Sequence, residues 1–320
     1  MSIKYFYQYF DLILDSDICL PELPEVSDVS SSLSFNLKKS PVDVSSYNWL
    51  HHWKNNEDIT ISFAKSDGCM VLHFPDYASF IMDQKKMSIH CYPYENINIS
   101  LIRHLLLDQV VPRFVSMCGA VVLHASAISV NGKCVIFIGK SGSGKSTLAC
   151  SFHMHSMALL CDDCLQLCEK KNGLVCIPSY NGSRLWSDSF YSLINDNTYG
   201  FKSIGNGGKK RLILSPPQRG KSSFPVSAIF LLNRQSDKNS RELNNIKVQI
   251  EPFNGSDAVI ALIECAFMLD LTDRQYITKF FENISRLVRS DVPIYQLDYC
   301  HEYQRLPEIR REILKIVERY

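Results

Sequence analysis

The sequence predicts an α/β fold for the larger, C-terminal part of the chain and a β-rich α+β module for the N-terminal part. A glycine-rich loop at residues 139–147 follows a strand pattern and precedes a helix pattern. Residues 1–98 instead contain short runs that alternate apolar and polar side chains, as half-buried strands do. After the loop, strand and helix patterns alternate. We therefore expect a mixed sheet flanked by helices.

Composition limits the classes of protein that fit. The chain has 320 residues, 46% of them hydrophobic, which is enough for one large or two ordinary domains. Its formal net charge of +1 gives no reason to expect a nucleic acid or an anionic membrane as partner. No run approaches roughly 18 apolar residues and no leader pattern opens the chain, so we expect a soluble cytoplasmic protein. Twelve cysteines in such a protein indicate reduced thiols.

Residues 1–98 form the predicted N-terminal module, which carries no catalytic motif. Residues 26–33 are polar and predict a loop. The scattered histidines in this part fit surface or core positions better than a metal site, namely His51, His52 and His73. Strands are expected at residues 5–10, 11–14, 58–63, 70–74 and 88–92.

A connecting helix is predicted over residues 99–119. Its apolar residues recur at helical spacing, Ser100 is a suitable N-cap, and Gly119 is a suitable stop. Pro112 predicts a kink. The catalytic domain is then expected to occupy residues 120–320.

A hairpin is predicted to lead into the glycine-rich loop. Residues 120–130 read as one buried strand that contains His124, a titratable group in an apolar run. Asn131-Gly132 is a strong signal for a two-residue turn. Residues 133–138 then form the strand that enters the loop.

The loop fits the phosphate-binding pattern GxxxxGK[ST], which predicts binding of ATP and Mg²⁺. Backbone N–H groups and the start of a helix together attract anions. Lys145 would reach the β- and γ-phosphates, and Ser146 would bind the magnesium ion. The alternative is a flexible turn. The remaining expected nucleotide contacts are Gly139, Ser141, Gly142, Ser143, Gly144 and Thr147.

Two adjacent acids end the next apolar strand pattern, at residues 157–167. Asp162 and Asp163 lie where a phosphate-binding loop needs a second magnesium anchor. One carboxylate could hold the metal while the other takes a proton from an incoming hydroxyl. The sequence does not decide which does which, and a solvated turn is the alternative.

The rest of the chain predicts scaffold. Thr272 is a suitable cap for the second of two helices, and Pro307 opens a final helix with one apolar face. A polar loop is expected at 235–242. The remaining predicted elements are strands at 225–232, 248–251 and 293–299 and helices at 256–269 and 272–290.

A zinc site is a weaker reading of one cluster. His153 and His155 precede Cys161 and Cys164, which are ligand types that zinc accepts. Zinc there would pull the two cysteines together across the acidic pair and compete with magnesium. We therefore favour buried thiols.

Three elements together resemble the catalytic domain of HPr kinase/phosphorylase. They are Leu123-His124-Ala-Ser-Ala127, Gly139-Lys-Ser-Gly-Ser-Gly-Lys-Ser146 and Cys161-Asp162-Asp163, at matching spacing. The chain looks more similar still to HPr-kinase-like proteins of modified-peptide clusters, including lasso peptide kinases. Residues 20–23, Leu-Pro-Glu-Leu, and 184–186, Arg-Leu-Trp, add to that likeness.

The resemblance implies a kinase domain of the HPr kinase and phosphoenolpyruvate carboxykinase type. Such domains transfer the γ-phosphate of ATP to a serine hydroxyl of a peptide or protein. On this chain it implies that Lys145 and Ser146 hold phosphate and Mg²⁺ and that His124 is an active-site residue. Asp162 and Asp163 match the acidic pair, and both are candidate magnesium ligands.

The sequence also departs from the bifunctional HPr kinases. The long glycine-rich signature of phosphorolysis is not found, so reversal of the reaction is not expected. Two basic stretches stand there instead, at 202–211 and 215–223, and could be lids or solvated surface. Arg184, Lys210 and Arg211 are the candidates for contacting the transferred phosphoryl group.

We therefore expect a cytoplasmic ATP- and Mg²⁺-dependent serine kinase that acts on a ribosomally made, lasso-type precursor peptide. Alternatives are an HPr-type regulatory kinase/phosphorylase, a small-molecule kinase or carboxykinase, and a nucleotide-gated binding module without transfer activity. The acidic pair with His124 favours transfer, because a switch needs no base. A homo-oligomer is left open.

Overall fold

The computed structural model describes residues 4–27, 29–55, 58–193, 201–204, 209–213, 222–234, 248–300 and 302–319. For residues 55, 58, 59, 201–204, 209, 211–213 and 234, only the backbone is described. The predicted loop at 235–242 lies outside these ranges, as do residues 205–208 and 215–221 of the two basic stretches. The chain divides into two compact units. Unit 1 is Met1–Gly119 with Met268–Ile277, and unit 2 is Ala120–Phe267 with Thr278–Tyr320.

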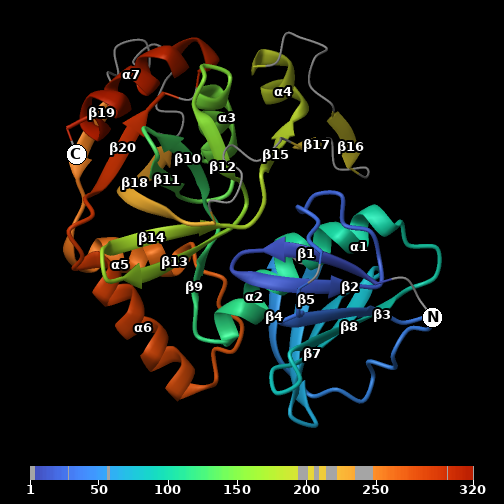
Figure 1. Ribbon diagram of the computed structural model, residues 1–320. Helices are drawn as coiled ribbons and strands as arrows, with labels where there is room; N and C mark the ends of the chain where they lie inside the picture. Colours follow the sequence, from blue (N-terminus) through green and yellow to red (C-terminus); the bar gives the residue numbers. More distant parts are fainter. Residues whose placement is uncertain are drawn as a thin grey trace. The chain divides into compact units, whose positions relative to one another are not determined.

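Unit 1 is built on one mixed sheet of eight strands (Figure 1), in the order β1-β2-β3-β8-β7-β6-β5-β4. Strand β3 pairs in parallel with β2 and β8, and the other neighbours are antiparallel. The strands are β1 (Tyr5–Tyr9), β2 (Leu12–Ser16), β3 (Leu33–Leu37), β4 (Trp49–Asn55), β5 (Asp58–Ser66), β6 (Cys69–Phe74), β7 (Ala78–Asp83) and β8 (Ser88–Pro93).

The predicted connecting helix consists of three consecutive helical segments. They are α1 (Ile99–Leu105), the π-helical turn η1 (Leu106–Val110) and α2 (Val111–Met117). Pro112 is the second residue of α2, and Val110 and Val111 before it also have right-handed helical backbone, so the chain stays helical through the junction. The N-cap is Asn98 and not the predicted Ser100, because the Asn98 side chain accepts a hydrogen bond from the Ser100 N–H.

Residues 268–277 belong to unit 1 through two side-chain contacts. The fully buried Asp270 forms an ion pair with Lys65 of β5. The Tyr276 hydroxyl lies 2.9 Å from the Ser116 hydroxyl of α2. A segment distant in sequence is thereby fixed to the β-rich unit.

Unit 2 has a nine-stranded mixed sheet, which confirms the predicted α/β class. Its main path is β12-β10-β11-β18-β14-β13-β9, and β20 pairs in parallel with β18 and carries β19. The strands are β9 (Val121–Leu123), β10 (Ser126–Val130), β11 (Lys133–Ile138), β12 (Ala158–Cys161), β13 (Leu165–Lys170), β14 (Gly173–Pro178), β18 (Phe224–Arg234), β19 (Gln249–Pro252) and β20 (Ile294–Tyr299). A separate small sheet contains β15 (Gly182–Trp186), β17 (Lys209–Ile213) and β16 (Phe201–Ile204).

The predicted strand at 120–130 is two strands. The chain leaves β9, which pairs with β13, and enters β10, which pairs with β11 and β12. His124 lies at the break, where its backbone N–H donates to the Cys265 carbonyl at 2.6 Å. The hairpin that follows is as predicted: Asn131 and Gly132 both have positive φ, 51° and 79°.

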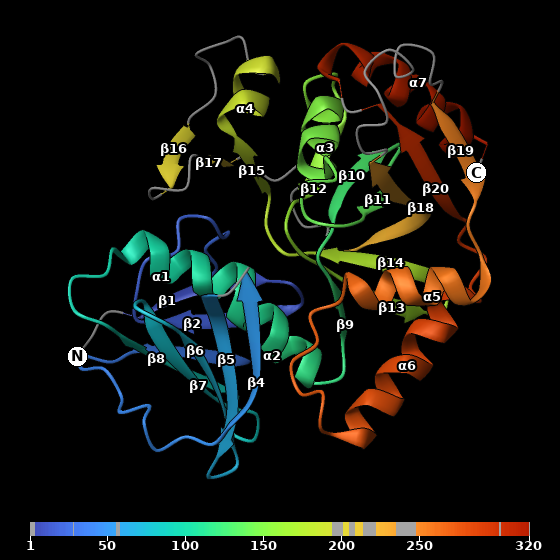
Figure 2. The same cartoon turned by 180° about the vertical axis from the view of Figure 1, so that it is seen from behind.

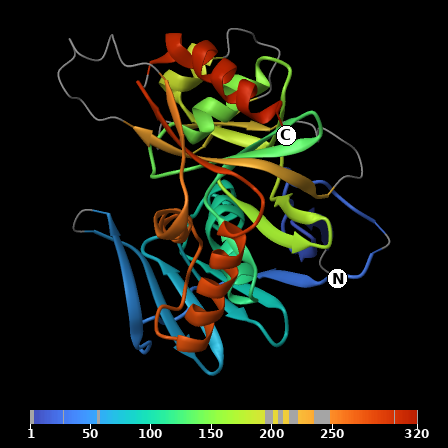
Figure 3. The same cartoon turned by 90° about the vertical axis from the view of Figure 1, so that its left-hand side faces the viewer.

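Two helices cover one face of this sheet. Helix α3 (Lys145–His153) and α7 (Leu306–Val317) lie side by side (Figures 1 and 2) and share one apolar core with β10, β11, β18 and β20. Phe137, Phe152 and Ile309 are fully buried in it. Helix α5 (Gly255–Glu264) lies on the other side of β18 from α7 (Figures 1 and 3). Its predicted end, residue 269, is too late because Ala266 already forms a β-bridge with Leu123.

Helix α6 (Arg274–Val288) begins after a turn that differs from the prediction. Thr272 does not cap it, since both its N–H and its hydroxyl donate to Asp270. Asp273 instead accepts a hydrogen bond from the Tyr276 N–H at 3.0 Å. Among the described residues no helix combines the length and apolar character that a membrane crossing requires.

Replacing Asp270 should destabilise unit 1 in a pH-dependent way. Burial raises the pKa of this carboxyl. The hydrogen bonds and charge from Lys65 and Thr272 together lower the pKa by more than burial raises it, so the folded-state pKa lies below the usual value. The stabilisation is therefore present above about pH 4 and is lost as the pH falls through the folded-state pKa. Asp270→Asn should lower the free energy of unfolding by about 1–3 kcal/mol at pH 7, and by less at pH 3, in urea titrations. Glu312→Gln, which removes an exposed ion pair on α7, should change little.

Candidate active site

The 139–147 loop connects β11 to α3 and depends on its glycines. Gly144 occupies the N-cap position of α3 with φ 94°, a conformation that other residues rarely adopt. Gly139 has φ 141°, and a Cβ there would lie 2.7 Å from the Leu232 backbone oxygen. The loop therefore packs directly against the end of β18, and it leads into the first turn of α3, whose N–H groups have no acceptor within the helix.

Lys145 is buried at the start of α3, with an exposed fraction of 6%. Its ammonium donates to the carbonyls of Gly139 and Lys140 at 2.8 and 3.1 Å. The Tyr299 hydroxyl of β20 donates to the Ser143 carbonyl at 2.7 Å. The loop thus wraps around one cationic group beside a helix N-terminus, which is an environment that favours an anion.

Asp162 is the hydrogen-bonding centre of the site. It follows β12 and is 2% exposed. Its Oδ1 accepts hydrogen bonds from the hydroxyls of Ser126 and Ser146, the latter at 3.0 Å. Its Oδ2 accepts from the Ser183 hydroxyl at 2.7 Å and the Arg184 N–H at 3.2 Å. These donors come from β10, α3 and β15, so one carboxylate joins three elements.

Opposing influences act on the ionisation of Asp162. Burial is the largest and raises the pKa of this carboxyl, and the charge of Asp163 raises it further. The three serine hydroxyls favour the ionised form and lower it. The pKa of Asp162 lies above the usual aspartate value, which means that binding of a proton or a cation to this carboxylate is favoured.

Asp163 faces a different partner. Its backbone has φ 68°, which turns the chain between β12 and β13. The Arg184 Nε donates to its Oδ2 at 2.7 Å in a largely buried ion pair. Strand β15 therefore contacts both acids, through Ser183 and Arg184.

His124 contacts the same turn from the break between β9 and β10. Its Nδ1 lies 2.8 Å from the Asp163 carbonyl oxygen. Burial and the nearby charge of Lys145 lower the pKa of His124, so the ring is neutral at pH 7. A carbonyl only accepts, so Nδ1 carries the proton and Nε2 keeps its lone pair.

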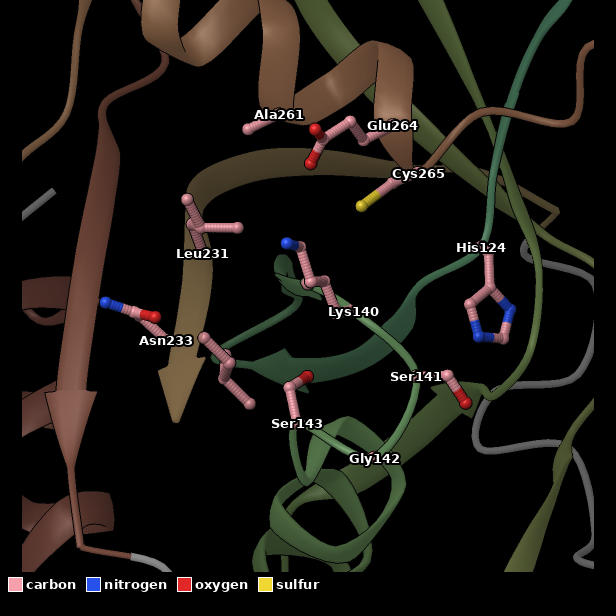
Figure 4. Close-up of a pocket in the computed structure, with 12 residues that line it drawn as sticks. His124, Lys140, Ser141, Gly142, Ser143, Leu231, Asn233, Ala261, Glu264 and Cys265 are labelled. Atoms are coloured by element: carbon pink, nitrogen blue, oxygen red, sulfur yellow. The ribbon is translucent and has the colours of Figure 1, made fainter. Parts of the chain in front are cut away.

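A pocket of about 340 Å³ opens over the first half of the loop (Figure 4). Figure 4 shows the Lys140 amine and the Glu264 carboxylate directed into it from opposite walls, with His124 at one end. Asn233 lies at the other end and donates to Asp298 at 2.8 Å. The pocket is lined by His124, Gly139, Lys140, Ser141, Gly142, Ser143, Leu231, Leu232, Asn233, Ala261, Glu264 and Cys265.

The three residues predicted to contact the phosphoryl group have different surroundings in the structure. Arg184 lies at the acidic pair. The Lys210 ammonium instead donates to the Tyr191 hydroxyl of α4 (Ser187–Leu193) at 2.6 Å and lies over the Phe190 and Tyr191 rings. Arg211 pairs through its backbone with Arg184 in the β15–β17 register, and its side chain lies outside the described part of the chain.

Several residues of the site were missed by sequence reasoning. Ser126 lies within the Leu-His-Ala-Ser-Ala element, and Ser183 directly precedes Arg184. Their signal was a hydroxyl in an otherwise apolar strand, which is common and weak. Thr147 was predicted, and its hydroxyl donates to Ser189 at 3.2 Å. Asn233, Glu264 and Cys265 had no local signal.

The alternative zinc cluster does not assemble. The Nδ1 atoms of His153 and His155 lie near the carbonyls of Met157 and Ser151. Over the residues that the structure describes, no three His, Cys, Asp or Glu side chains gather around a metal position. Cys161 and Cys164 are buried thiols.

Replacing Gly139 should destabilise unit 2 more than replacing a glycine in open space. In Gly139→Ala the new methyl would meet Leu232 and Ser143 at 2.7 and 2.9 Å. The matched control is Gly173→Ala, which also has positive φ but no atom within 4 Å of a Cβ. Urea unfolding should show a loss of about 1 kcal/mol for the control, from φ alone, and at least twice that for Gly139→Ala. Equal losses would mean that the loop is not packed against β18.

Comparisons with known proteins give little beyond this geometry. No family model matches the chain, and no curated protein matches it in sequence. Among solved structures, the HPr(Ser) kinase/phosphatase from Coxiella burnetii is similar over 61% of this chain and 97% of that chain, with 14% identity and a TM-score of 0.29. A likeness of this size does not assign a function.

Proposed function

We propose that unit 2 is an ATP- and Mg²⁺-dependent kinase that transfers the γ-phosphate to a serine hydroxyl of a peptide or protein. One observation supports it most: Lys145, the Ser146–Asp162 hydrogen bond, Asp163 and His124 all lie around one loop at a helix N-terminus. This set combines phosphate binding with a carboxylate that could take a proton. A pocket adjoins it.

ATP would bind with its phosphates at the start of α3. The N–H groups there and the Lys145 ammonium supply positive charge. Lys145 would exchange its bonds to the Gly139 and Lys140 carbonyls for bonds to phosphate oxygens. The residues proposed to surround the phosphates are Gly139, Ser141, Gly142, Ser143, Gly144, Lys145, Ser146 and Thr147.

The residues beside the loop also fit Mg²⁺, which prefers oxygen ligands. Ser146 would bind it through its hydroxyl lone pairs, with Asp162 holding that hydroxyl in place by accepting its proton, and Asp163 follows Asp162 in the chain. The raised pKa of Asp162 fits a carboxylate that a cation would neutralise. When bound, Mg²⁺ would neutralise charge on the phosphate oxygens.

We assign the proton acceptor to Asp163 and the metal-side role to Asp162. A carboxylate has about four acceptor positions, and Asp162 already receives four hydrogen bonds. In the proposed transfer, the serine oxygen bonds to the γ-phosphorus as the bond to the bridging oxygen breaks. ADP leaves, and the serine proton passes to Asp163. Arg184 would turn from Asp163 to the phosphoryl group as charge develops on it during this step.

The acceptor that we propose is a serine of a peptide. The pocket beside His124 is large enough for an amino-acid side chain and its neighbours, which suits a peptide. A lasso-type precursor peptide is our first candidate.

Incubation of this protein and a candidate peptide with ATP and Mg²⁺, followed by mass spectrometry, should show one added phosphate on a peptide serine. Phosphorylation of HPr alone would indicate a regulatory kinase, and ATP binding without transfer would indicate a nucleotide-gated module.

Removing the Lys145 amine should abolish transfer. Lys145→Ala would take away the cation that the loop encloses, so nucleotide affinity should fall at least tenfold in a fluorescent-ATP titration. Lys279→Ala, on an exposed position of α6, should bind like the unmodified protein. Unchanged affinity in Lys145→Ala would rule out this loop as the phosphate site.

The two aspartates should separate in kinetics. Asp163→Asn should retain nucleotide binding and lower kcat by about 10²–10⁴-fold, because the proton acceptor is lost. Asp162→Asn should instead raise the Mg²⁺ concentration needed for half-maximal rate. Normal turnover in both variants would contradict the assigned chemistry, and the reverse pattern would exchange the two roles.

A further inference from the structure

We infer that Ser126 and Ser183 are positioning residues that set the Asp162 carboxylate, and through it the Ser146 hydroxyl, for the metal ion. This inference rests on the proposed function. The observation behind it is the set of hydrogen bonds that Asp162 accepts from β10 and β15, in addition to the expected one from α3. Neither serine has a role in phosphate binding or proton transfer.

The two hydroxyls act on different carboxylate oxygens. Ser126 is fully buried at the first residue of β10 and donates to Oδ1. Ser183 is 2% exposed on β15 and donates to Oδ2 at 2.7 Å. Each carboxylate oxygen thus accepts two hydrogen bonds, so rotation of the carboxylate plane about the Cβ–Cγ bond would disturb bonds on both oxygens at once.

This restraint is transmitted to Ser146. The Ser146 hydroxyl donates its one proton to Oδ1 at 3.0 Å, so its lone pairs must face away from Asp162. Those lone pairs are the only groups that this hydroxyl can offer to a cation. Holding the carboxylate plane still therefore fixes the direction in which Ser146 can bind metal.

Burying the Asp162 carboxylate without these donors would raise the free energy of the folded protein. An unpaired charge in a dry site shifts toward the protonated form or draws in other partners. Loss of either serine hydroxyl would leave one oxygen of Asp162 with a single partner. Fewer hydrogen bonds would then oppose rotation of the carboxylate toward the Arg184 guanidinium, and Ser146 would lose its fixed acceptor.

The test compares nucleotide binding with and without metal. The probe is a fluorescent ATP analogue, titrated into the full chain in EDTA and in Mn²⁺, which substitutes for Mg²⁺. In Ser126→Ala and Ser183→Ala, affinity in EDTA should stay within about twofold of the unmodified protein, since the loop contacts remain. The gain in affinity on adding Mn²⁺ should fall by roughly tenfold, as for other residues that orient metal ligands.

Two kinds of variant separate positioning from packing. Ser183→Thr and Ser126→Thr keep the hydroxyl and should restore at least part of the Mn²⁺-dependent gain. Ser227→Ala is the matched control: it removes a buried strand serine that donates to the Cys134 carbonyl at 3.0 Å, away from the acidic pair. It should bind nucleotide and Mn²⁺ normally. Thermal unfolding of every variant is recorded in parallel.

The outcomes distinguish this inference from the proposed function. An unmodified protein that does not bind the ATP analogue would overturn both. Normal binding by the unmodified protein, with an unchanged Mn²⁺ gain in both alanine variants, would overturn the inference alone. Alanine variants that fail to fold, or that lose affinity equally in EDTA and Mn²⁺, would show a structural role and also overturn it.

Discussion

The burial of one charged carboxylate is the constraint on which the site depends. Asp162 is almost completely removed from water, and a carboxylate in that position needs hydrogen-bond donors on both oxygens. The chain supplies them from β10, α3 and β15, which are distant in sequence. Satisfying this charge therefore brings together β10, the helix after the loop and the small sheet that carries Arg184.

The order of strands explains how the other groups reach the same place. β11, β12, β18 and β20 run in the same direction, so their carboxyl ends meet at one edge of the sheet. The loop leaves β11 at this edge, the acidic pair follows β12, and the pocket wall at 231–233 ends β18. The break at His124 adds a neutral imidazole from outside this set. The Asp163 carbonyl holds the ring, and the Cys265 carbonyl holds the backbone N–H of His124.

The two cations of the site each have a hydrogen-bond partner within the protein. Lys145 donates to loop carbonyls, and Arg184 donates to Asp163. Both could exchange these partners for phosphate oxygens without moving to another part of the site. Lys210 has a different environment, over two aromatic rings of α4. Arg184 thus lies beside the acidic pair, where the proposed transfer takes place.

Local sequence patterns were sufficient for the parts of the chain that local forces determine. Asn131-Gly132 required positive φ at both residues, and a two-residue hairpin formed. The strand, glycine loop and helix over 133–153 were read correctly because each depends on neighbouring residues. The helix caps at Asn98 and Asp273 were misread by one or two positions, because several polar residues nearby could accept the same N–H.

Only the tertiary structure decided the connections between distant residues. Residues 120–130 look like one apolar strand, but pairing with β13 on one side and with β11 on the other divides it at His124. Ser126 and Ser183 lie 36 and 21 residues from Asp162 in sequence, so no local pattern links them to it. The fold brings both hydroxyls to the Asp162 carboxylate, where they donate hydrogen bonds. A side chain's hydrogen-bond partner depends on which backbone segments pack beside it. The sequence by itself therefore determined the glycine-rich loop and the hairpin turn before it, while packing decided which residues hold the acidic pair.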